Sequence, residues 1–396
     1  IFIYGGSIKP SHENTDYVTV CEKTGEYAKG DISEDELIRI EEISVKGPGS
    51  CGGMYTANTM ASAIEALGMS LPGSSSQDAI SNNKKHDCKE AGTAIEHLIE
   101  LDLKPSDIMT KEAFENAITA VIALGGSTNA VLHLLAMADA IGVDLHLDDF
   151  SRIGENVPVI ADIKPFGNHF MSELNEQGGI SPVLKMLLDK NLLHGDCLTV
   201  TGKTLAENLE DISPYNSSQG IIKSLEDPIK GSSHLRILYG NLAPEGAVAK
   251  ITGQEGTIFE GKARVFNSEE DGNEAILNKE IKAGDVVVIR YEGPKGGPEA
   301  EVAADDGLDR RASGHGRPGH VVVHRIVCEG ADDGVHIHGV EGLHKGGDHS
   351  IGFAHCASPR AQAESSDEAL GATVMRARSA GCTYPSPSAW SRKASR

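Results

Sequence analysis

In the first half of the chain, apolar residues recur every three to four positions, which is the spacing of amphipathic helices. Ser33 is predicted to cap a helix over residues 31–42, and Ser106 one over residues 107–124. An Ala-rich run over residues 54–67 follows a glycine turn and ends at Gly68, a residue type that favours a helix end. Further helices are predicted over residues 89–101, 130–141 and 182–190.

The pattern changes after about residue 211. Short β-branched runs bounded by Gly and Asp predict strands over residues 236–239, 247–251, 263–266 and 285–290. The polar stretch 211–220 is the predicted boundary between two domains. We expect an α/β fold class, with an N-terminal α/β domain (1–211) that binds a cluster and a C-terminal β-barrel-like domain (221–378). The Ser/Pro-rich residues 379–396 are expected to form an irregular, disordered tail.

Composition narrows the class of protein. The chain has 396 residues and a net charge of −22, and such an acidic surface repels phosphate backbones, so nucleic acid is an unsuitable partner. No apolar run is long enough to cross a membrane. The seven cysteines are odd in number and form no Cys-x-x-Cys pair, unlike a secreted disulfide framework. We therefore expect an intracellular protein, mitochondrial if its source is eukaryotic and otherwise cytoplasmic.

Residue usage shifts again after Pro298. Arginine replaces lysine as the main cation, and half of the 16 histidines fall in this last quarter. The first residues lack an initiator Met and read as the end of a strand entering a glycine turn, so the chain is expected to begin inside a domain. Because of the shift in residue usage, residues 299–396 are expected to have a different origin from residues 1–298.

Cys51 is the first candidate for chemistry. It lies between Ser50 and Gly52-Gly53, just before the predicted Ala-rich helix. The N-terminus of a helix stabilises a thiolate, and glycines let a bulky group approach the backbone. This pattern fits a ligand of a metal or iron–sulfur cluster, or a nucleophile. A small buried cysteine at a tight turn fits it equally well.

The segment Gly125-Gly126-Ser127-Thr128-Asn129 is a second glycine turn at a helix start. Its free N–H groups and three polar side chains predict a site for a carboxylate or phosphate. Plain N-capping by Ser127 or Thr128 is the alternative. Two weaker candidates have the spacing of metal ligands, His194 with Cys197 and His336 with His338. For these, a satisfied turn histidine and a histidine-rich composition are the simpler interpretations.

Five segments resemble the dihydroxy-acid dehydratases of branched-chain amino acid synthesis, and the similarity is nearly continuous over residues 1–298. The segments are residues 50–76, 123–136, 194–209, 240–250 and 284–298. Sugar-acid dehydratases share the superfamily, but the runs GSCGGMYTANTM and APEGAVAK are more similar to the dihydroxy-acid branch.

This resemblance implies a homodimeric hydro-lyase that converts 2,3-dihydroxy-3-methyl carboxylates to 2-keto acids. It implies a [2Fe-2S] cluster with Cys51 as one ligand, and Mg²⁺. The other ligand cysteines, and the Asp and carbamylated Lys that hold Mg²⁺, belong to family segments upstream of the first Tyr-Gly-Gly. For the remaining Mg²⁺ ligand, a glutamate, Glu299 and Glu301 are the candidates.

The sequence also departs from the family pattern. The family's serine-base motif is absent, so the catalytic residue of this chain is unknown. An inactive copy is therefore expected, and two alternatives stay open. One is a non-catalytic fragment or paralogue of the family, and the other is a sugar-acid dehydratase.

Overall fold

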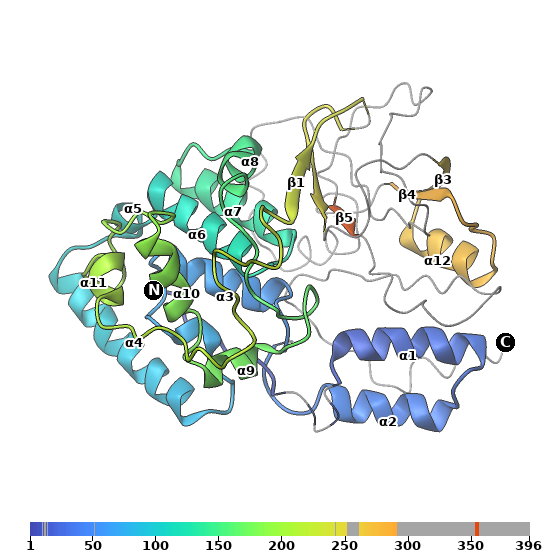
Figure 1. Ribbon diagram of the computed structural model, residues 1–396, viewed down its shortest axis with the longest axis horizontal. Helices are drawn as coiled ribbons and strands as arrows, with labels where there is room; N and C mark the ends of the chain where they lie inside the picture. The colour runs from blue at the N-terminus through green and yellow to red at the C-terminus, as the bar shows by residue number, and fades with distance from the viewer. Residues whose placement is uncertain are drawn as a thin grey trace, which may run out of the picture.

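The computed structural model describes residues 1–9, 11, 13, 15–50, 52–241, 243–251 and 261–290, together with the backbone of residues 353–355. Helices dominate up to about residue 210 (Figure 1). In chain order they are α1 (Tyr17–Lys29), α2 (Glu34–Ser44), α3 (Thr56–Ala66), a 3₁₀ turn η1 (Ser74–Ser76), α4 (Asn82–Glu100), α5 (Pro105–Ile108), α6 (Lys111–Ala123), α7 (Asn129–Ile141), α8 (Leu147–Gly154), α9 (Met171–Glu176), α10 (Ser181–Asp189) and α11 (Leu205–Leu209).

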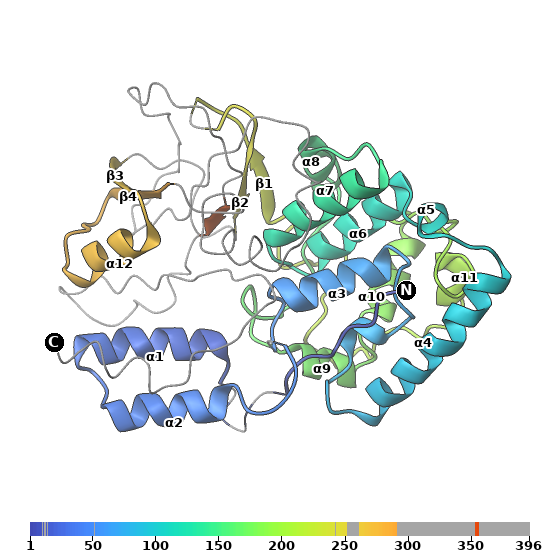
Figure 2. The ribbon, with the colours of Figure 1, turned by 180° about the vertical axis from the view of Figure 1, so that it is seen from behind.

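The helices form two groups. The hairpin of α1 and α2 stands beside the larger group of α3–α11 in both views (Figures 1 and 2). Within the larger group, α3 packs against α6, and both are almost wholly buried. None of the helices in the described ranges is long and apolar enough to cross a bilayer.

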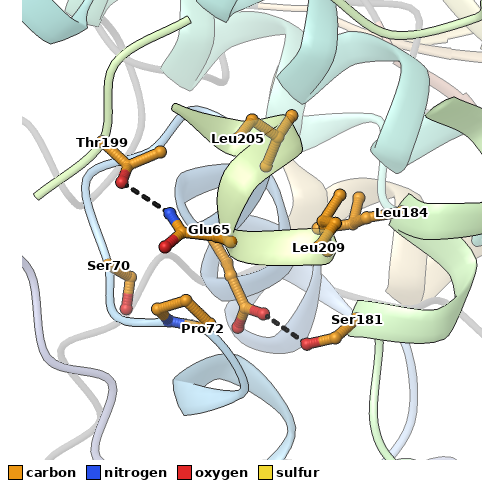
Figure 3. Close-up of a pocket in the computed structure, with 9 residues that line it drawn as sticks. Glu65, Ser70, Pro72, Ser181, Leu184, Thr199, Leu205 and Leu209 are labelled. Atoms are coloured by element: carbon orange, nitrogen blue, oxygen red, sulfur yellow. Dashed lines mark hydrogen bonds between the residues drawn. The ribbon is translucent and has the colours of Figure 1, made fainter. Parts of the chain in front are cut away.

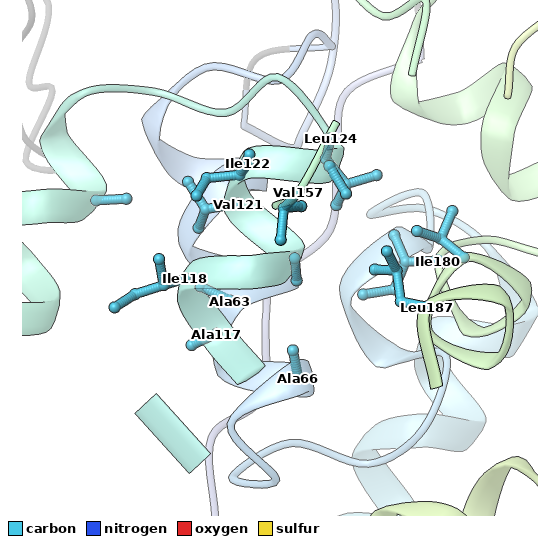
Figure 4. Close-up of a cluster of buried hydrophobic side chains, with 14 of the residues drawn as sticks. Ala63, Ala66, Ala117, Ile118, Val121, Ile122, Leu124, Val157, Ile180 and Leu187 are labelled. Carbon is cyan, nitrogen blue, oxygen red and sulfur yellow. The ribbon is translucent and has the colours of Figure 1, made fainter. Parts of the chain in front are cut away.

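Alanines set the close packing of α3 on α6. Ala63 and Ala66 of α3 and Ala117 of α6 are buried, and short side chains let two helix backbones approach closely (Figure 4). Larger side chains of α6, among them Ile118 and Ile122, fill the space toward α8 and the following loops. Because α3 carries polar groups at its first turn, this packing also fixes the position of those groups.

The strands form two small sheets. Strand β1 (Leu235–Leu238) pairs antiparallel with β2 (Ala247–Lys250), and β5 (Phe353–His355) pairs parallel with β2. Strands β3 (Lys262–Phe266) and β4 (Asp285–Ile289) are parallel, and α12 (Glu269–Leu277) lies in the chain between them. Parallel neighbours need a crossover connection, which this helix provides. Strand β1 packs against α8, and β2 lies beside β1 (Figure 2), whereas β3, β4 and α12 form a separate unit (Figure 1).

The mixed helix and strand character is confirmed. Ser33 caps α2, accepting a hydrogen bond from the backbone N–H of Glu36, and all four predicted strand runs are strands within a residue or two. The cap predicted at Ser106 is wrong. Pro105 begins the short helix α5 there, and Thr110 caps α6, its hydroxyl accepting from the N–H of Ala113.

Strand pairing in the N-terminal part is sparse. Within the described residues before β1, only isolated bridges occur, such as Ser7 with Ser50 and with Asp78. The sequence missed the helices α1, α8, α9, α11 and α12, and the helix predicted over residues 89–101 begins earlier, at Asn82. Helices α8, α9 and α11 are eight residues or shorter, and α1 and α12 contain glycine, a weak helix former. The tail over residues 379–396 lies outside the described residues.

Candidate functional site

The two glycine turns singled out in the sequence meet at the N-terminal turn of α3. The first turn leads directly into α3, and the second, between α6 and α7, is hydrogen-bonded to α3 from the side. Asn129 Nδ2 donates to Thr56 Oγ1 over 2.9 Å, and the backbone N–H of Ser127 donates to Thr59 Oγ1 over 2.9 Å. The hydroxyls of Thr56 and Ser127 are 3.3 Å apart. Two segments about 75 positions apart in the chain are thus brought to one place.

Cys51 itself lies outside the described residues, but both of its neighbours are fixed by backbone hydrogen bonds. Ser50 donates its N–H to the carbonyl of Gly6 over 3.0 Å, and the carbonyl of Gly52 accepts from the N–H of Met171 over 2.7 Å. The turn is therefore bonded to the N-terminal segment on one side and to α9 on the other.

Tyr4 and Asn58 hold the first turn from inside, and sequence reasoning missed both. The buried Tyr4 hydroxyl donates to Asn58 Oδ1 over 2.6 Å and also contacts the hydroxyl of Ser50. Asn58 Nδ2 donates in turn to the carbonyl of Gly53 over 2.7 Å. Asn58 is fully buried, so its amide needs specific partners, but no pattern in the sequence indicates that burial.

The glycines of the first turn make room for protein atoms. A Cβ on Gly53 would lie 2.7 Å from the carbonyl oxygen of Lys164, and one on Gly52 would lie 3.1 Å from the ring of Phe170. The N–H of Met54 donates to the same Lys164 carbonyl over 2.6 Å. The space beside Gly52 and Gly53 is filled by protein atoms of the loop before α9. The expectation that these glycines admit a bulky ligand is therefore not met at these two positions.

In the second turn, Ser127 is the capping residue. Its hydroxyl accepts from the N–H of Asn129 over 3.2 Å, whereas the side chain of Thr128 makes no cap hydrogen bond and its backbone is already helical. Thr128 and Asn129 are buried, and only Ser127 is partly exposed. A ligand approaching the start of α7 would therefore meet Ser127 first.

Two side chains from the strands contact the same turn on its other side, and sequence reasoning missed these as well. His234 Nε2 lies 2.7 Å from the carbonyl oxygen of Gly126. Lys250 Nζ lies 3.4 Å from the carbonyl oxygen of Gly125 and 3.5 Å from that of Gly126. Burial lowers the pKa of Lys250 to about 8.

Of the weaker metal candidates, His194 and Cys197 do not form a site in the described part of the chain. His194 Nε2 lies 2.7 Å from a carboxylate oxygen of Glu115, so it is a satisfied surface histidine. Burial raises the pKa of the Cys197 thiol to about 11, which keeps it protonated. In the described ranges, no group of three or more His, Cys, Asp or Glu is placed to hold a metal ion. His336, His338, Glu299 and Glu301 lie outside those ranges.

A small cavity lies at the other end of α3, beside Glu65 (Figure 3). It is lined by α10, α11 and the loop after α3, and its room of about 10 Å³ fits a single water molecule. The carboxylate of Glu65 accepts from the N–H of Gly73 over 2.7 Å and of Ser75 over 2.9 Å. Burial raises the pKa of Glu65. These contacts anchor the loop to α3, which is a structural role.

Two models of one protein family match most of this chain. Residues 1–208 match the family model of the dihydroxy-acid/6-phosphogluconate dehydratase N-terminal region, and residues 220–334 match the C-terminal region of the same family. The chain belongs to this dehydratase family. Both glycine turns and α3 lie within the first match, and His234 and Lys250 lie within the second.

Individual relatives agree with the family models. The chain is 68% identical over 298 residues to a dihydroxy-acid dehydratase of Chromohalobacter salexigens, which is 75% of this chain and 52% of that protein. It is 65% identical over 298 residues to the enzyme of the same name in Ruthia magnifica, covering 75% of this chain and 53% of that protein. The chain thus spans about half the length of the curated relatives that it matches.

Replacing Gly53 by alanine is expected to lower the free energy of unfolding by about 1–3 kcal/mol, because the new Cβ would meet the Lys164 carbonyl at 2.7 Å. Gly92→Ala is the matched control. Gly92 lies on the exposed side of α4, where a Cβ meets nothing within 4 Å, so the change should raise stability by up to about 1 kcal/mol. Urea denaturation of both variants measures the difference, and equal effects would contradict the close packing of the turn.

Lys250 is expected to make stability rise with pH. Its folded pKa of about 8 lies below the ordinary 10.5, so the unfolded chain binds more protons between these values. The free energy of unfolding should therefore increase from pH 8 to pH 10.5, by up to about 3 kcal/mol from this group. Lys250→Met should remove this increase. Because the raised pKa of Cys197 gives an opposing slope in both proteins, the difference between their pH profiles is the measurement, and parallel profiles would refute the assignment.

Proposed function

We propose that this chain is a hydro-lyase of the dihydroxy-acid dehydratase type. The reaction would convert 2,3-dihydroxy-3-methyl carboxylates to 2-keto acids in valine and isoleucine biosynthesis. One observation supports it above all others: the two glycine turns of the family-like segments meet on the first turn of α3, in a chain 68% identical over 298 residues to a dihydroxy-acid dehydratase.

The second turn is proposed to bind the substrate's carboxylate through Ser127, Thr128 and Asn129. It opens α7, a helix of 13 residues, and the start of a helix carries partial positive charge. Ser127 is its partly exposed hydroxyl, and hydrogen bonds to Thr56 and Thr59 fix the turn behind it. A substrate carboxylate at this point would be held by a preformed arrangement, with little ordering of side chains on binding.

Cofactors are proposed from the family. The open iron site of a [2Fe-2S] cluster would act as a Lewis acid for the poor hydroxide leaving group, and Mg²⁺ would neutralise the substrate's carboxylate and 2-hydroxyl. Cys51 is the proposed cluster ligand, and Glu299 or Glu301 the proposed Mg²⁺ ligand. The described part of the chain has no group of three or more potential ligands, so it does not complete a metal site. A homodimer and a division into domains at residues 211–221, with a barrel-like second domain, are proposed on the same basis.

A non-catalytic fragment or paralogue of the family is the second candidate. One observation favours it: the family's serine-base motif does not occur in the sequence. A sugar-acid dehydratase is the third candidate, since the family description includes 6-phosphogluconate dehydratases. The choice of substrate bound distinguishes a sugar-acid dehydratase from a dihydroxy-acid dehydratase. Turnover distinguishes an active enzyme from a non-catalytic fragment or paralogue.

Binding of 2,3-dihydroxy-isovalerate should depend on Ser127. We expect Ser127→Ala to weaken the affinity about tenfold, because one hydrogen bond to a charged group is lost. Ser106→Ala, in the exposed helix α5, is the control and should bind as the unchanged chain does. Calorimetry with 2,3-dihydroxy-isovalerate and with 6-phosphogluconate gives the test. Tighter binding of 6-phosphogluconate would favour a sugar-acid dehydratase, and equal binding by both serine variants would contradict the role of Ser127.

Turnover by this 396-residue chain alone should be low. After reconstitution with iron, sulfide and Mg²⁺, we expect a rate about a hundredfold or more below that of the Chromohalobacter salexigens relative, because no family base is recognisable here. Formation of 2-keto acid from 2,3-dihydroxy-isovalerate is the measurement. A rate comparable to the relative's would contradict this expectation and the fragment hypothesis together.

A further inference from the structure

His234 and Lys250 stand side by side at one end of the β1–β2 strand pair. Lys250 is the register partner of Leu235, the residue after His234, and the N–H of Ile251 donates to the carbonyl of His234 over 2.7 Å. His234 lies just before the first residue of β1, outside the strand's regular alternation, and its side chain contacts the same turn as that of Lys250. The β1–β2 pair therefore places an imidazole and an ammonium group beside the same turn.

Both groups are directed to the backbone of the second glycine turn. A carbonyl oxygen can only accept, so His234 Nε2 must carry the proton in its 2.7 Å contact with Gly126. Lys250 Nζ lies 3.4 and 3.5 Å from the two glycine carbonyls. His234 is fully buried and Lys250 is 4% exposed, so water competes little for these contacts.

The position of the turn offsets part of the cost of burying a cation there. Gly125 and Gly126 follow the C-terminal end of α6, where the helix dipole is negative. An ammonium group near these carbonyls is favourable, and it offsets part of the cost of burying Lys250. The following residues, from Asn129 on, form α7, so the same turn joins one helix end to the next helix start.

We infer that His234 and Lys250 are positioning residues that clamp the Gly125-Gly126 turn and so hold Ser127, Thr128 and Asn129 in place against α3. The role of those three residues in binding rests on the proposed function. The contacts of the clamp are with backbone carbonyls, and α3 holds the opposite side through Thr56 and Thr59. The strands therefore support the turn through its backbone carbonyls, on the side away from α3.

Hydrogen exchange of the full chain tests the clamp without any need for activity. The reporters are the amides of Gly126 and Ser127, which donate to the carbonyl of Val121 and to Thr59 Oγ1. Lys250→Met removes the charge, and His234→Phe removes the donor while keeping a ring beside Phe166. Each change should speed exchange of these amides about tenfold, since a turn that has lost one of its two supports opens more often.

Three controls make the result decisive. Lys250→Arg should restore slow exchange, because it keeps the donor and the charge. Lys262→Met, on the exposed start of β3, should leave the turn unchanged. The amides of α10 report on global unfolding. Unchanged exchange at Gly126 and Ser127, or equal acceleration in α10, would overturn the inference.

Ligand binding separates this inference from the proposed function. If the clamp acts as inferred, Lys250→Met weakens binding of 2,3-dihydroxy-isovalerate and Lys250→Arg restores it. If the unchanged chain does not bind this acid, the proposed function fails, and the exchange experiment still decides whether the clamp exists.

Discussion

The first turn of α3 is the constraint on which the candidate site depends. Thr56, Asn58 and Thr59 sit within four positions of one another, and each hydrogen-bonds a loop that is distant in sequence or lies at the helix entrance. A helix start normally leaves backbone donors to be satisfied by caps or water. Here the side chains of that turn serve two glycine turns, so the placement of both follows from the placement of one helix.

Close packing makes this arrangement rigid. The alanines of α3 let it lie near α6, and the glycines before α3 let the loop that precedes α9 lie against the turn. Protein interiors are packed like organic crystals, so a single added methyl group is felt at such contacts. The glycines of the first turn are accordingly explained by protein packing at Gly52 and Gly53. Their presence in a family-like motif is not by itself a sign of an open ligand site.

The second half of the chain contributes to the first. Strands β1 and β2 supply His234 and Lys250, whose buried polar groups contact the turn between α6 and α7. A buried lysine is costly unless it is well placed, and the negative end of α6 reduces that cost. This pairing of a helical part with a strand part fits the two successive regions by which the dehydratase family is recognised.

The sequence alone determined several of the helices, the strands β1–β4, the Ser33 cap, the two glycine turns and the family, because periodicity, capping and long similar segments are local signals. It did not determine that α6 begins separately after Thr110, since Ser106 and Thr110 are both acceptable caps. It could not find Tyr4, Asn58, His234 or Lys250, whose partners lie far away in the chain. Only the tertiary structure decided which buried polar groups meet, because hydrogen bonds between distant segments depend on the packing of α3, α6 and the strands, which no local pattern encodes.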